Sequence, residues 1–343
     1  FSFSFVFPIV ISIVFDDGAL PIFLKTLISI SLLGLTGLFL TRNIKNDLSQ
    51  KDGFVIIVMF WIVLSLTGSV PFYLSGMTLI DSVFESMSGI TTTGATVISS
   101  LDGLPESILF YRQLLQWMGG MGLIVLAIAV MPLLGIGGGQ IYKTEVPGAM
   151  GEQRLTPRIK ETAQALWLIY FGLTAICGIL YYLSGMTAFD AISHAMSTVA
   201  IGGFSTHDES IGFFNSISIE LICICFMLLS AFSFALHYFA IYKRKPLKYA
   251  FDPEFKFFIS FLFIILFIAV LIGFFVQDGK SPSIREIIFH TVSMVTTTGF
   301  SISDTSDWPF SMSFLLLIGA FVGACSGSVG GGVKSWRIMI MLN

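Results

Sequence analysis

The sequence has few charged residues, and this scarcity limits the class of protein that it can encode. Asp, Glu, Lys and Arg make up 11% of its 343 residues, whereas soluble globular domains carry roughly 25%. Hydrophobic residues make up 55%, and the mean hydropathy is +0.89. This composition excludes a soluble globule and indicates a polytopic membrane protein.

Cysteine is scarce as well. The residues are Cys177, Cys223, Cys225 and Cys325. They lie in apolar segments and form no Cys-x-x-Cys pair, which argues against a disulfide framework or a cysteine-bound metal. We therefore expect them to be small core residues.

Catalytic signatures are also missing. Neither a Gly-x-Ser-x-Gly elbow nor a His-Glu-x-x-His motif occurs in the sequence. An intramembrane hydrolase would thus lack a matched nucleophile and base, and we predict that the protein is not an enzyme.

The few charges are distributed unevenly along the chain. Basic residues gather in three loops and near the end of the sequence: Arg42, Lys45, Lys51; Lys143, Arg154, Arg158, Lys160; Lys243, Arg244, Lys245, Lys248, Lys256; Lys334 and Arg337. The alternate loops are acidic, with Arg112, Lys280 and Arg285 as their only nearby cations: Asp16, Asp17, Asp102, Glu106, Asp208, Glu209, Asp278, Asp304 and Asp307. The positive-inside rule predicts that the basic loops are cytoplasmic and the acidic loops face outward.

A repeat organises the chain. The hexapeptide at 73–78 recurs unchanged at 182–187, and each copy precedes a short glycine-centred loop. A third such loop, with Thr297, Thr298 and Gly299, has no hexapeptide before it. Repetition at a fixed spacing marks duplicated architecture.

Long and short apolar segments alternate with the same period. About 20 apolar residues are needed to span a bilayer, so the long segments are predicted spans and the short ones re-entrant half-helices. The three units comprise 53–74, 79–90 and 106–134; 160–184, 187–198 and 213–242; and 253–276, 283–295 and 309–341. A hairpin of segments 1–15 and 20–40 precedes them. We predict an all-α membrane fold divided into an N-terminal hairpin (1–50) and pore repeats at 51–142, 143–250 and 251–343.

The loops after the half-helices are candidates for a cation filter. Irregular backbone at membrane depth is tolerated only inside protein or beside water. Extended Thr-Thr-Gly segments can present carbonyl and hydroxyl oxygens, and each preceding half-helix directs the negative end of its dipole toward the same place. These glycine-centred loops lie at 91–95, 200–204 and 296–301. The second has no threonine hydroxyl, so its contribution must come from the backbone.

Other interpretations of these elements exist. A single Thr-Thr-Thr-Gly loop would serve equally well as a helix-capping turn, but three copies in register favour a filter. Acidic and His residues one turn apart on the half-helices suggest proton relays or metal ligands: Asp81 and Glu85, Asp190 and His194, Glu286 and His290. We favour structural anchors, because no third ligand keeps the required spacing.

The last predicted span contains a run of small residues at 323–334, named here the glycine-rich break. Its candidate gating residues are Gly323, Cys325, Ser326, Gly327, Ser328, Gly330, Gly331, Gly332 and Lys334. Its spacing does not fit a phosphate-binding loop. Close helix packing is an alternative, but a polar, flexible segment beneath a filter favours a gate.

Together these motifs resemble the Trk/Ktr/HKT superfamily of potassium transporters. The residues that carry the resemblance lie at 87–96, 197–208 and 327–334. The hairpin and the segment 155–163 are most similar to bacterial Trk-H type membrane subunits. The resemblance implies potassium uptake across the bacterial cytoplasmic membrane, potassium as substrate with no covalently bound cofactor, a homodimer in the lipid bilayer and a cytosolic nucleotide-binding regulatory subunit of the Trk-A type. It also implies a carbonyl-lined potassium filter made of three segments, named here the candidate filter segments: Thr92, Thr93, Gly94; Ile201, Gly202, Gly203; Thr297, Thr298, Gly299. We expect the cytosolic partner to move the glycine-rich break through Lys334 and Arg337. No nucleic-acid partner is expected.

One feature departs from the family pattern, which has four pore repeats where this sequence holds three. Three units alone would leave filter backbone facing lipid, so we expect a fourth repeat to follow and the first helix to be truncated at Phe1. A secondary transporter of another small solute, with a midplane site between broken helices, is the rival interpretation.

Overall fold

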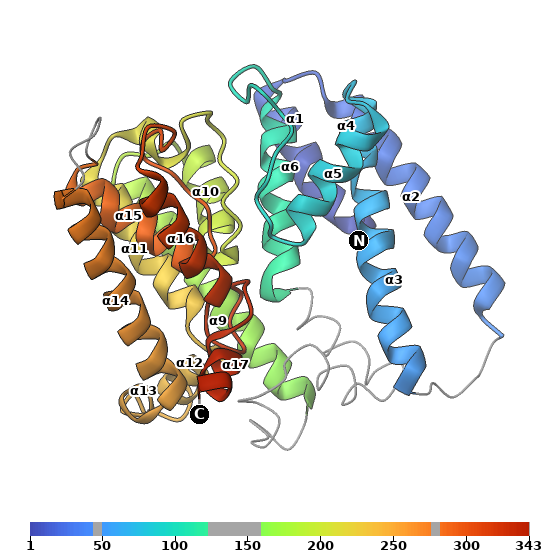
Figure 1. Ribbon diagram of the computed structural model, residues 1–343. Helices are drawn as coiled ribbons and strands as arrows, with labels where there is room; N and C mark the ends of the chain where they lie inside the picture. The colour runs from blue at the N-terminus through green and yellow to red at the C-terminus, as the bar shows by residue number, and fades with distance from the viewer. Residues whose placement is uncertain (44–49, 123–158, 276–281, 343) are drawn as a thin grey trace.

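The computed structural model describes residues 1–43, 50–122, 159–275 and 282–342. Every regular element in these ranges is helical (Figure 1). A short 3₁₀ turn, η1 (Ser2–Phe5), leads into α1 (Val6–Phe15), and α2 (Leu20–Thr41) runs back beside it. Asp16 ends α1 in the left-handed conformation, with φ of 50°, and Asp17 Oδ1 accepts the Ala19 N–H at 3.0 Å. These contacts make the predicted hairpin.

The first unit follows the predicted long, short, long order. Its first span is α3 (Gln50–Gly68) continued by α4 (Val70–Leu74), and its half-helix is α5 (Leu79–Ile90). Then α6 (Glu106–Trp117) runs into a π-helical turn, η2 (Met118–Gly122). The predicted span 106–134 continues beyond the described residues. Helix α5 packs against both α3 and α6.

The second unit has the same order but differs at its end. It contains α9 (Ile159–Leu183), the half-helix α10 (Ala188–Ala200), η4 (Ser210–Phe214), α11 (Ile217–Ala231), α12 (Phe234–Ile241) and α13 (Lys248–Phe251). The prediction of one continuous span over 213–242 is wrong, because α11 and α12 are bent by 96° at Phe232 and Ser233.

The third unit contains the break that the sequence predicts. Its helices are α14 (Pro253–Phe275), the half-helix α15 (Ile284–Val295), α16 (Phe310–Val322) and α17 (Ser335–Leu342). The glycine-rich break separates α16 from α17, and α15 packs between α14 and α16.

Lengths and surfaces agree with a membrane protein. Among the described residues, three helical stretches are long and apolar enough to cross a bilayer: Leu20–Thr41, Gln164–Leu183 and Pro253–Phe275. The bent pair of α11 and α12 is a fourth if taken as one span. Many large apolar side chains on these helices face outward, Phe263 and Phe267 among them, at 63% and 64% exposed. Such surface requires an apolar solvent.

The cysteine prediction holds for three residues. Cys177, Cys223 and Cys325 are buried, as expected of core residues, whereas Cys225 is exposed on α11. All four are free thiols. Cys225 lies only two positions from Cys223, so it projects from a different face of the helix.

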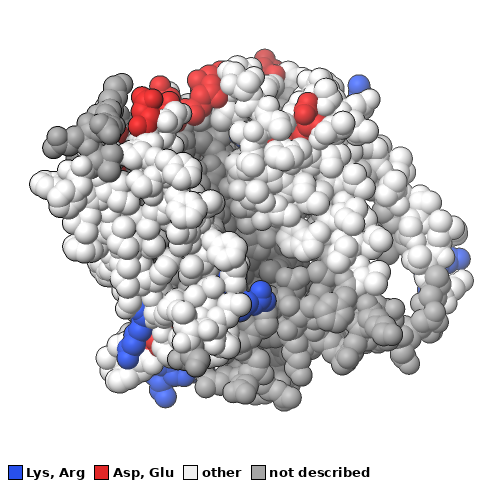
Figure 2. Space-filling model, in the orientation of Figure 1, with Lys and Arg blue, Asp and Glu red and all other residues white. Residues whose placement is uncertain are grey.

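Charge divides the molecule into two ends. Figure 2 shows acidic side chains along the upper edge and most of the basic side chains at the lower end, with a broad uncharged band between them. The exposed Asp102, Asp208 and Asp304 lie in loops that follow the half-helices, and the exposed Lys243 and Lys245 follow α12. The acidic and basic loops thus lie at opposite ends, as their alternation along the sequence predicts, and the cytoplasmic side of the basic end stays a prediction. The predicted sites at Lys45 and Arg154 lie outside the described residues.

We expect cysteine labelling to reproduce this polarity. In a variant without native cysteines, D102C, D208C and D304C should react with a membrane-impermeant maleimide added outside intact cells, and K245C only after the membrane is opened. K45C and R154C should behave like K245C. Reaction of K245C from outside, with protection of the three acidic-loop positions, would reverse the topology.

Candidate functional site

The three half-helices begin with the same side-chain cap, although they belong to different units. In each, a Thr or Ser hydroxyl accepts the backbone N–H of an acidic residue three positions later: Thr78 from Asp81 at 3.2 Å, Thr187 from Asp190 at 3.1 Å, and Ser283 from Glu286 at 3.3 Å. Such caps satisfy exposed N–H groups and place a negative charge at the positive end of the helix. Asp81, Asp190 and Glu286 therefore anchor the half-helices, which supports the structural interpretation.

The His residues of the predicted pairs are also held by their own helices. His194 Nδ1 lies 2.9 Å from the Asp190 carbonyl oxygen, and His290 Nδ1 lies 2.9 Å from that of Glu286. His194 Nε2 contacts Ser205 Oγ at 3.0 Å. In the described part of the chain, no group of three or more His, Cys, Asp or Glu residues could hold a metal ion.

The candidate filter segments share one backbone conformation. Their first and third residues have positive φ, which the middle residues lack: Thr92 55° and Gly94 76°, Ile201 53° and Gly203 81°, Thr297 65° and Gly299 87°. The first residues are strained, because the left-handed region is unfavourable for residues with a Cβ, above all a β-branched one. The same strained conformation therefore recurs in all three units.

The half-helices bind the amide groups of these segments. The N–H of each middle residue is donated to a serine carbonyl of the preceding helix: Thr93 to Ser88 at 2.9 Å, Gly202 to Ser197 at 2.9 Å, and Thr298 to Ser293 at 2.8 Å. The N–H of each first residue is donated to the carbonyl of the helix residue that follows this serine: Thr92 to Gly89, Ile201 to Thr198, and Thr297 to Met294. The half-helices thus bind the N–H groups of the first two residues of each segment.

Two glycines allow the segments to lie side by side. A Cβ placed on Gly94 would lie 2.1 Å from the Gly202 carbonyl oxygen, and one placed on Gly203 would lie 2.1 Å from the Thr298 carbonyl oxygen. No side chain fits at such distances. The first segment therefore abuts the second, and the second abuts the third. Gly299 differs, since a Cβ placed on it would meet no atom within 4 Å.

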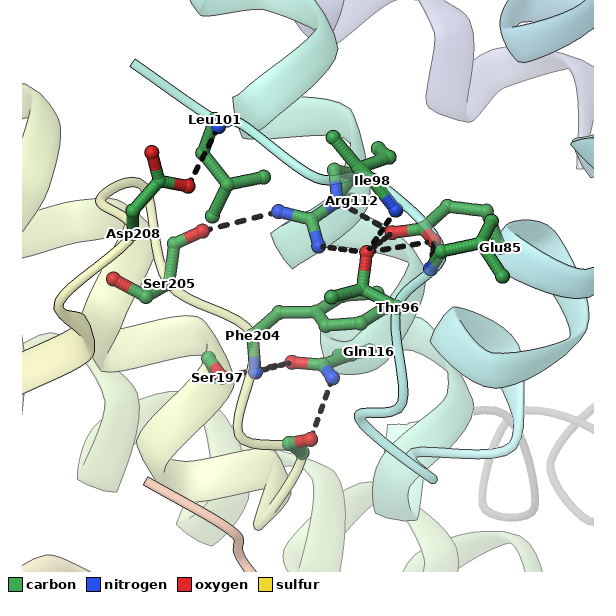
Figure 3. A network of polar contacts seen from close by, with 12 residues as sticks. Glu85, Thr96, Ile98, Leu101, Arg112, Gln116, Ser197, Phe204, Ser205 and Asp208 are labelled. Atoms are coloured by element: carbon green, nitrogen blue, oxygen red, sulfur yellow. Dashed lines mark hydrogen bonds and ion pairs between the residues drawn. The ribbon is translucent and has the colours of Figure 1, made fainter. Parts of the chain in front are cut away.

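Arg112 lies behind the first two segments, on α6 (Figure 3). Its side chain is 1% exposed, and Nε lies 2.7 Å from Glu85 Oε1 in a buried ion pair. The guanidinium also donates to the Ser205 carbonyl at 3.1 Å and to Thr96 Oγ1 at 3.2 Å, and it lies over the Phe204 ring at 4.1 Å. One side chain thus joins the half-helix of the first unit to the loop of the second. The sequence predicts Arg112 only as a cation near the acidic loops, and its buried ion pair with Glu85 adds to that prediction.

Gln116, one turn further along α6, supports the second segment directly. Its Nε2 donates to the Gly202 carbonyl at 2.7 Å, and its Oε1 accepts from Ser197 Oγ at 2.7 Å and from the Phe204 N–H at 3.2 Å (Figure 3). Sequence reasoning missed this residue. The signal was the spacing of Arg112 and Gln116 by four residues in a membrane segment, which places both on one face of α6.

The glycine-rich break contacts two of the segments. The Gly331 N–H donates to Thr297 Oγ1 at 2.6 Å. A Cβ on Gly330 would lie 3.1 Å from the Thr296 carbonyl oxygen and 3.6 Å from Ile201 Cδ1. The break therefore packs against the second and third candidate filter segments.

The bend between α11 and α12 docks onto this break. The Cys325 N–H donates to the Ala231 carbonyl at 3.1 Å, and the Phe234 N–H donates to the Gly327 carbonyl at 3.0 Å. Two interrupted helices thereby satisfy each other's backbone groups, which an apolar environment requires. This pairing accounts for the bend, although its residues include neither Gly nor Pro.

Lys334 folds back onto the break. Its Nζ donates to the Gly330 carbonyl and lies 3.4 Å from the Ser328 carbonyl oxygen, and its φ is 78°. The Lys334 ammonium group therefore contacts earlier residues of the same break. The side chain of Arg337, in contrast, is exposed.

The outer loops bring the first two units together. His207 lies between carboxylates, with Nδ1 3.4 Å from Asp102 and Nε2 3.3 Å from Asp190. Partial burial lowers the pKa of His207, but these carboxylates outweigh that effect and raise the pKa above its ordinary value. Asp208 accepts the Leu101 N–H at 2.7 Å. Further acidic residues surround a cavity of about 490 Å³, which is lined by Asp208, Glu209, Gly212, Ser301, Ile302, Ser303, Asp304 and Thr305.

Comparisons with known proteins find relatives over nearly the whole chain. The family model TrkH, described as a cation transport protein, matches residues 19–343. The Trk system potassium uptake protein TrkH of Halomonas elongata is 49% identical over 346 residues, with 100% of this chain and 72% of the relative covered. That of Escherichia coli K12 is 44% identical, with 99% and 72% covered. The crystal structure of the potassium transporter TrkH from Vibrio parahaemolyticus superposes with a TM-score of 0.87 at 44% identity and covers 100% of this chain and 71% of that one.

Proposed function

Because the chain belongs to the TrkH family of cation transport proteins, we propose that it takes up potassium across the cytoplasmic membrane through a pore lined by the candidate filter segments. The observation that carries the proposal is the backbone conformation common to residues 92–94, 201–203 and 297–299, with amides bound by the half-helices. Segments of this kind supply oxygen atoms that can replace the hydration shell of a hard monovalent cation. Potassium is then the substrate, and no resident cofactor is required.

The surroundings of the segments favour a cation in the same place. The half-helices end there, so the negative ends of their dipoles converge on the segments. The acidic outer loops raise the local cation concentration at the entrance. Gln116 fixes the position of the Gly202 carbonyl by occupying one of its lone pairs. Pseudo-symmetry of the three units around one pore is part of this proposal, as are the domain limits at 50, 142 and 250.

The assembly around the chain is also proposed. The relatives are named for a Trk system, which supports a cytosolic Trk-A type regulatory subunit, and we propose a homodimer as its membrane part. The exposed basic residues after α12, together with Arg337, offer a surface to an acidic partner. Gly94 and Gly203 each lie against the next segment, whereas Gly299 has no neighbour within 4 Å of the Cβ position. The space beside Gly299 suits a fourth segment of the same kind.

The experiment that tests transport is uptake of rubidium into proteoliposomes that contain the whole protein. We expect saturable uptake that potassium inhibits and organic solutes leave unchanged, because a site made of backbone oxygens selects by ion size and charge. Uptake of an organic solute, without rubidium flux, would support the secondary transporter instead.

The glycine-rich break is proposed as the gate, because it contacts Thr297 and lies against Ile201. Deletion of residues 330–332 should remove these contacts, raise basal rubidium flux and weaken regulation. A matched deletion of 34–36 in α2, where Gly34 has no close neighbour, should leave basal flux unchanged in the folded protein. Wild-type flux and regulation in the folded 330–332 deletion would show that the break serves packing alone.

A further inference from the structure

Glu254 contacts both ends of the glycine-rich break. This residue lies in the first turn of α14 and is 3% exposed. A single carboxylate oxygen, Oε1, accepts the Ser326 N–H at 2.6 Å and the Trp336 N–H at 3.1 Å. Ser326 lies near the start of the break, and Trp336 lies in the first turn of α17, just after the break ends. One side chain thus holds together two points that are ten positions apart in the chain.

We propose that Glu254 is a positioning residue that latches the glycine-rich break in its closed conformation. The inference rests on the proposed gating function and adds the group that holds the gate. Glu254 contacts no candidate filter segment in the hydrogen bonds of the described residues. It therefore acts through the break and not on the permeating ion.

The glycine-rich break has other hydrogen bonds besides those to Glu254. The break is bonded to the bend between α11 and α12 through backbone groups at Ala231 and Phe234. Those bonds join the second unit to the third. Helix α17 is also bonded to the break directly, since Ser335 donates its N–H to the Ala324 carbonyl and its hydroxyl to the Gly323 carbonyl, both at 3.1 Å. Glu254 ties the break and α17 to a third element, α14, because its two donors lie on either side. A displacement of the break and α17 away from α14 must therefore separate Ser326 and Trp336 from the carboxylate.

The negative charge of the Glu254 carboxylate strengthens its hydrogen bonds to the break. A charged acceptor forms hydrogen bonds roughly twice as strong as a neutral one. No Lys or Arg in the described ranges forms an ion pair with Glu254. Besides the two N–H groups, the Ser326 hydroxyl and the Lys334 cation interact with the carboxylate. If the carboxylate is removed, two buried donors lose their partner, which favours conformations in which water reaches them.

The test uses the whole protein with E254M, which keeps the size of the side chain but has no acceptor. We expect basal rubidium flux to rise about tenfold, since one hydrogen bond to a charged group shifts an equilibrium by roughly that factor. E254Q keeps a neutral acceptor, so we expect it to rescue most of the closed state, with a rise of about threefold. E220Q is the matched control, because Glu220 is also 3% exposed but pairs with Arg285 on the outer side.

The rate at which the Cys325 thiol is modified provides a second measurement. A general loss of stability would not change it selectively. This thiol is 1% exposed and precedes Ser326 in the break. In a C225A background, which removes the exposed thiol, modification by a small maleimide is followed by site-resolved mass spectrometry. The latch predicts faster modification of Cys325 in E254M and E254Q, with Cys177 and Cys223 remaining as slow as in the parent protein.

The outcomes separate the latch from the gate. Wild-type flux and Cys325 reactivity in both E254 variants, with raised flux in the 330–332 deletion, would overturn the latch and keep the gate. Unchanged flux in the deletion would overturn the gate and the latch with it. Equal acceleration at Cys177, Cys223 and Cys325 would assign Glu254 to stability alone. If E254M does not fold, wild-type behaviour of E254Q overturns the latch.

Discussion

Replacement of Arg112 by Met is expected to destabilise the folded protein by about 3–5 kcal/mol, because it leaves Glu85 buried without its partner. Glu85 is 0% exposed, and the two side chains meet at 2.7 Å. The same substitution removes the donors to Ser205 and Thr96 and the cation over the Phe204 ring. Thermal unfolding of the purified protein in detergent measures the effect.

The double variant E85Q/R112M serves as the control for this prediction. It removes both charges, so it should recover a large part of the lost stability, since the main penalty comes from the unpaired buried carboxylate. Rubidium flux should remain below wild type even then, because Ser205 has lost the donor that orients the loop after Gly203. If R112M alone unfolds at the wild-type temperature, the buried pair does not brace the first two units.

Replacement of Gly203 by Ser is expected to lower the permeability ratio of potassium over sodium by about tenfold or more. The left-handed conformation costs a residue with a Cβ roughly 1–2 kcal/mol, and about 1.4 kcal/mol corresponds to a factor of ten. The new Cβ would also lie 2.1 Å from the Thr298 carbonyl oxygen, so that oxygen must move. A displaced oxygen no longer matches the size of the potassium ion. Reversal potentials under bi-ionic conditions measure the ratio.

Two further variants define the specificity of this effect. G94S should act like G203S, because its Cβ would lie 2.1 Å from the Gly202 carbonyl oxygen. G172S, on α9, should leave the ratio unchanged, since a Cβ there meets no atom within 4 Å. An unaltered ratio in folded G94S and G203S would remove these glycines from the selective part of the pore.

The local signals in the sequence predicted the half-helices closely. The expected segment 79–90 corresponds to Leu79–Ile90, and 283–295 to Ile284–Val295. Both begin at a Thr or Ser followed three residues later by an acidic residue, a pattern that specifies a helix start through local hydrogen bonds. The glycine-rich break was predictable for a similar reason, because a run of glycines cannot continue a stable helix.

Features that depend on contacts between units were not predictable. The bend at Phe232 and Ser233 has no Gly or Pro, and its cause is pairing with the glycine-rich break about 90 positions away. The ion pair of Arg112 was not predictable either, because its partner, Glu85, lies on another helix. The latch at Glu254 required the same kind of information, since its two donors lie more than 70 positions further along the chain. Such pairings arise from tertiary packing, which local patterns do not encode.

The measurement that tests the central claim most directly is the location of a bound ion. Crystals of the whole protein grown with thallium, an anomalous scatterer of similar size to potassium, should show a strong anomalous peak coordinated by oxygens of the candidate filter segments, between Thr92, Gly202 and Thr297. We expect potassium, but not sodium, to displace this peak. A thallium peak confined to the acidic outer cavity around Asp208 and Asp304, with none at the segments, would contradict it.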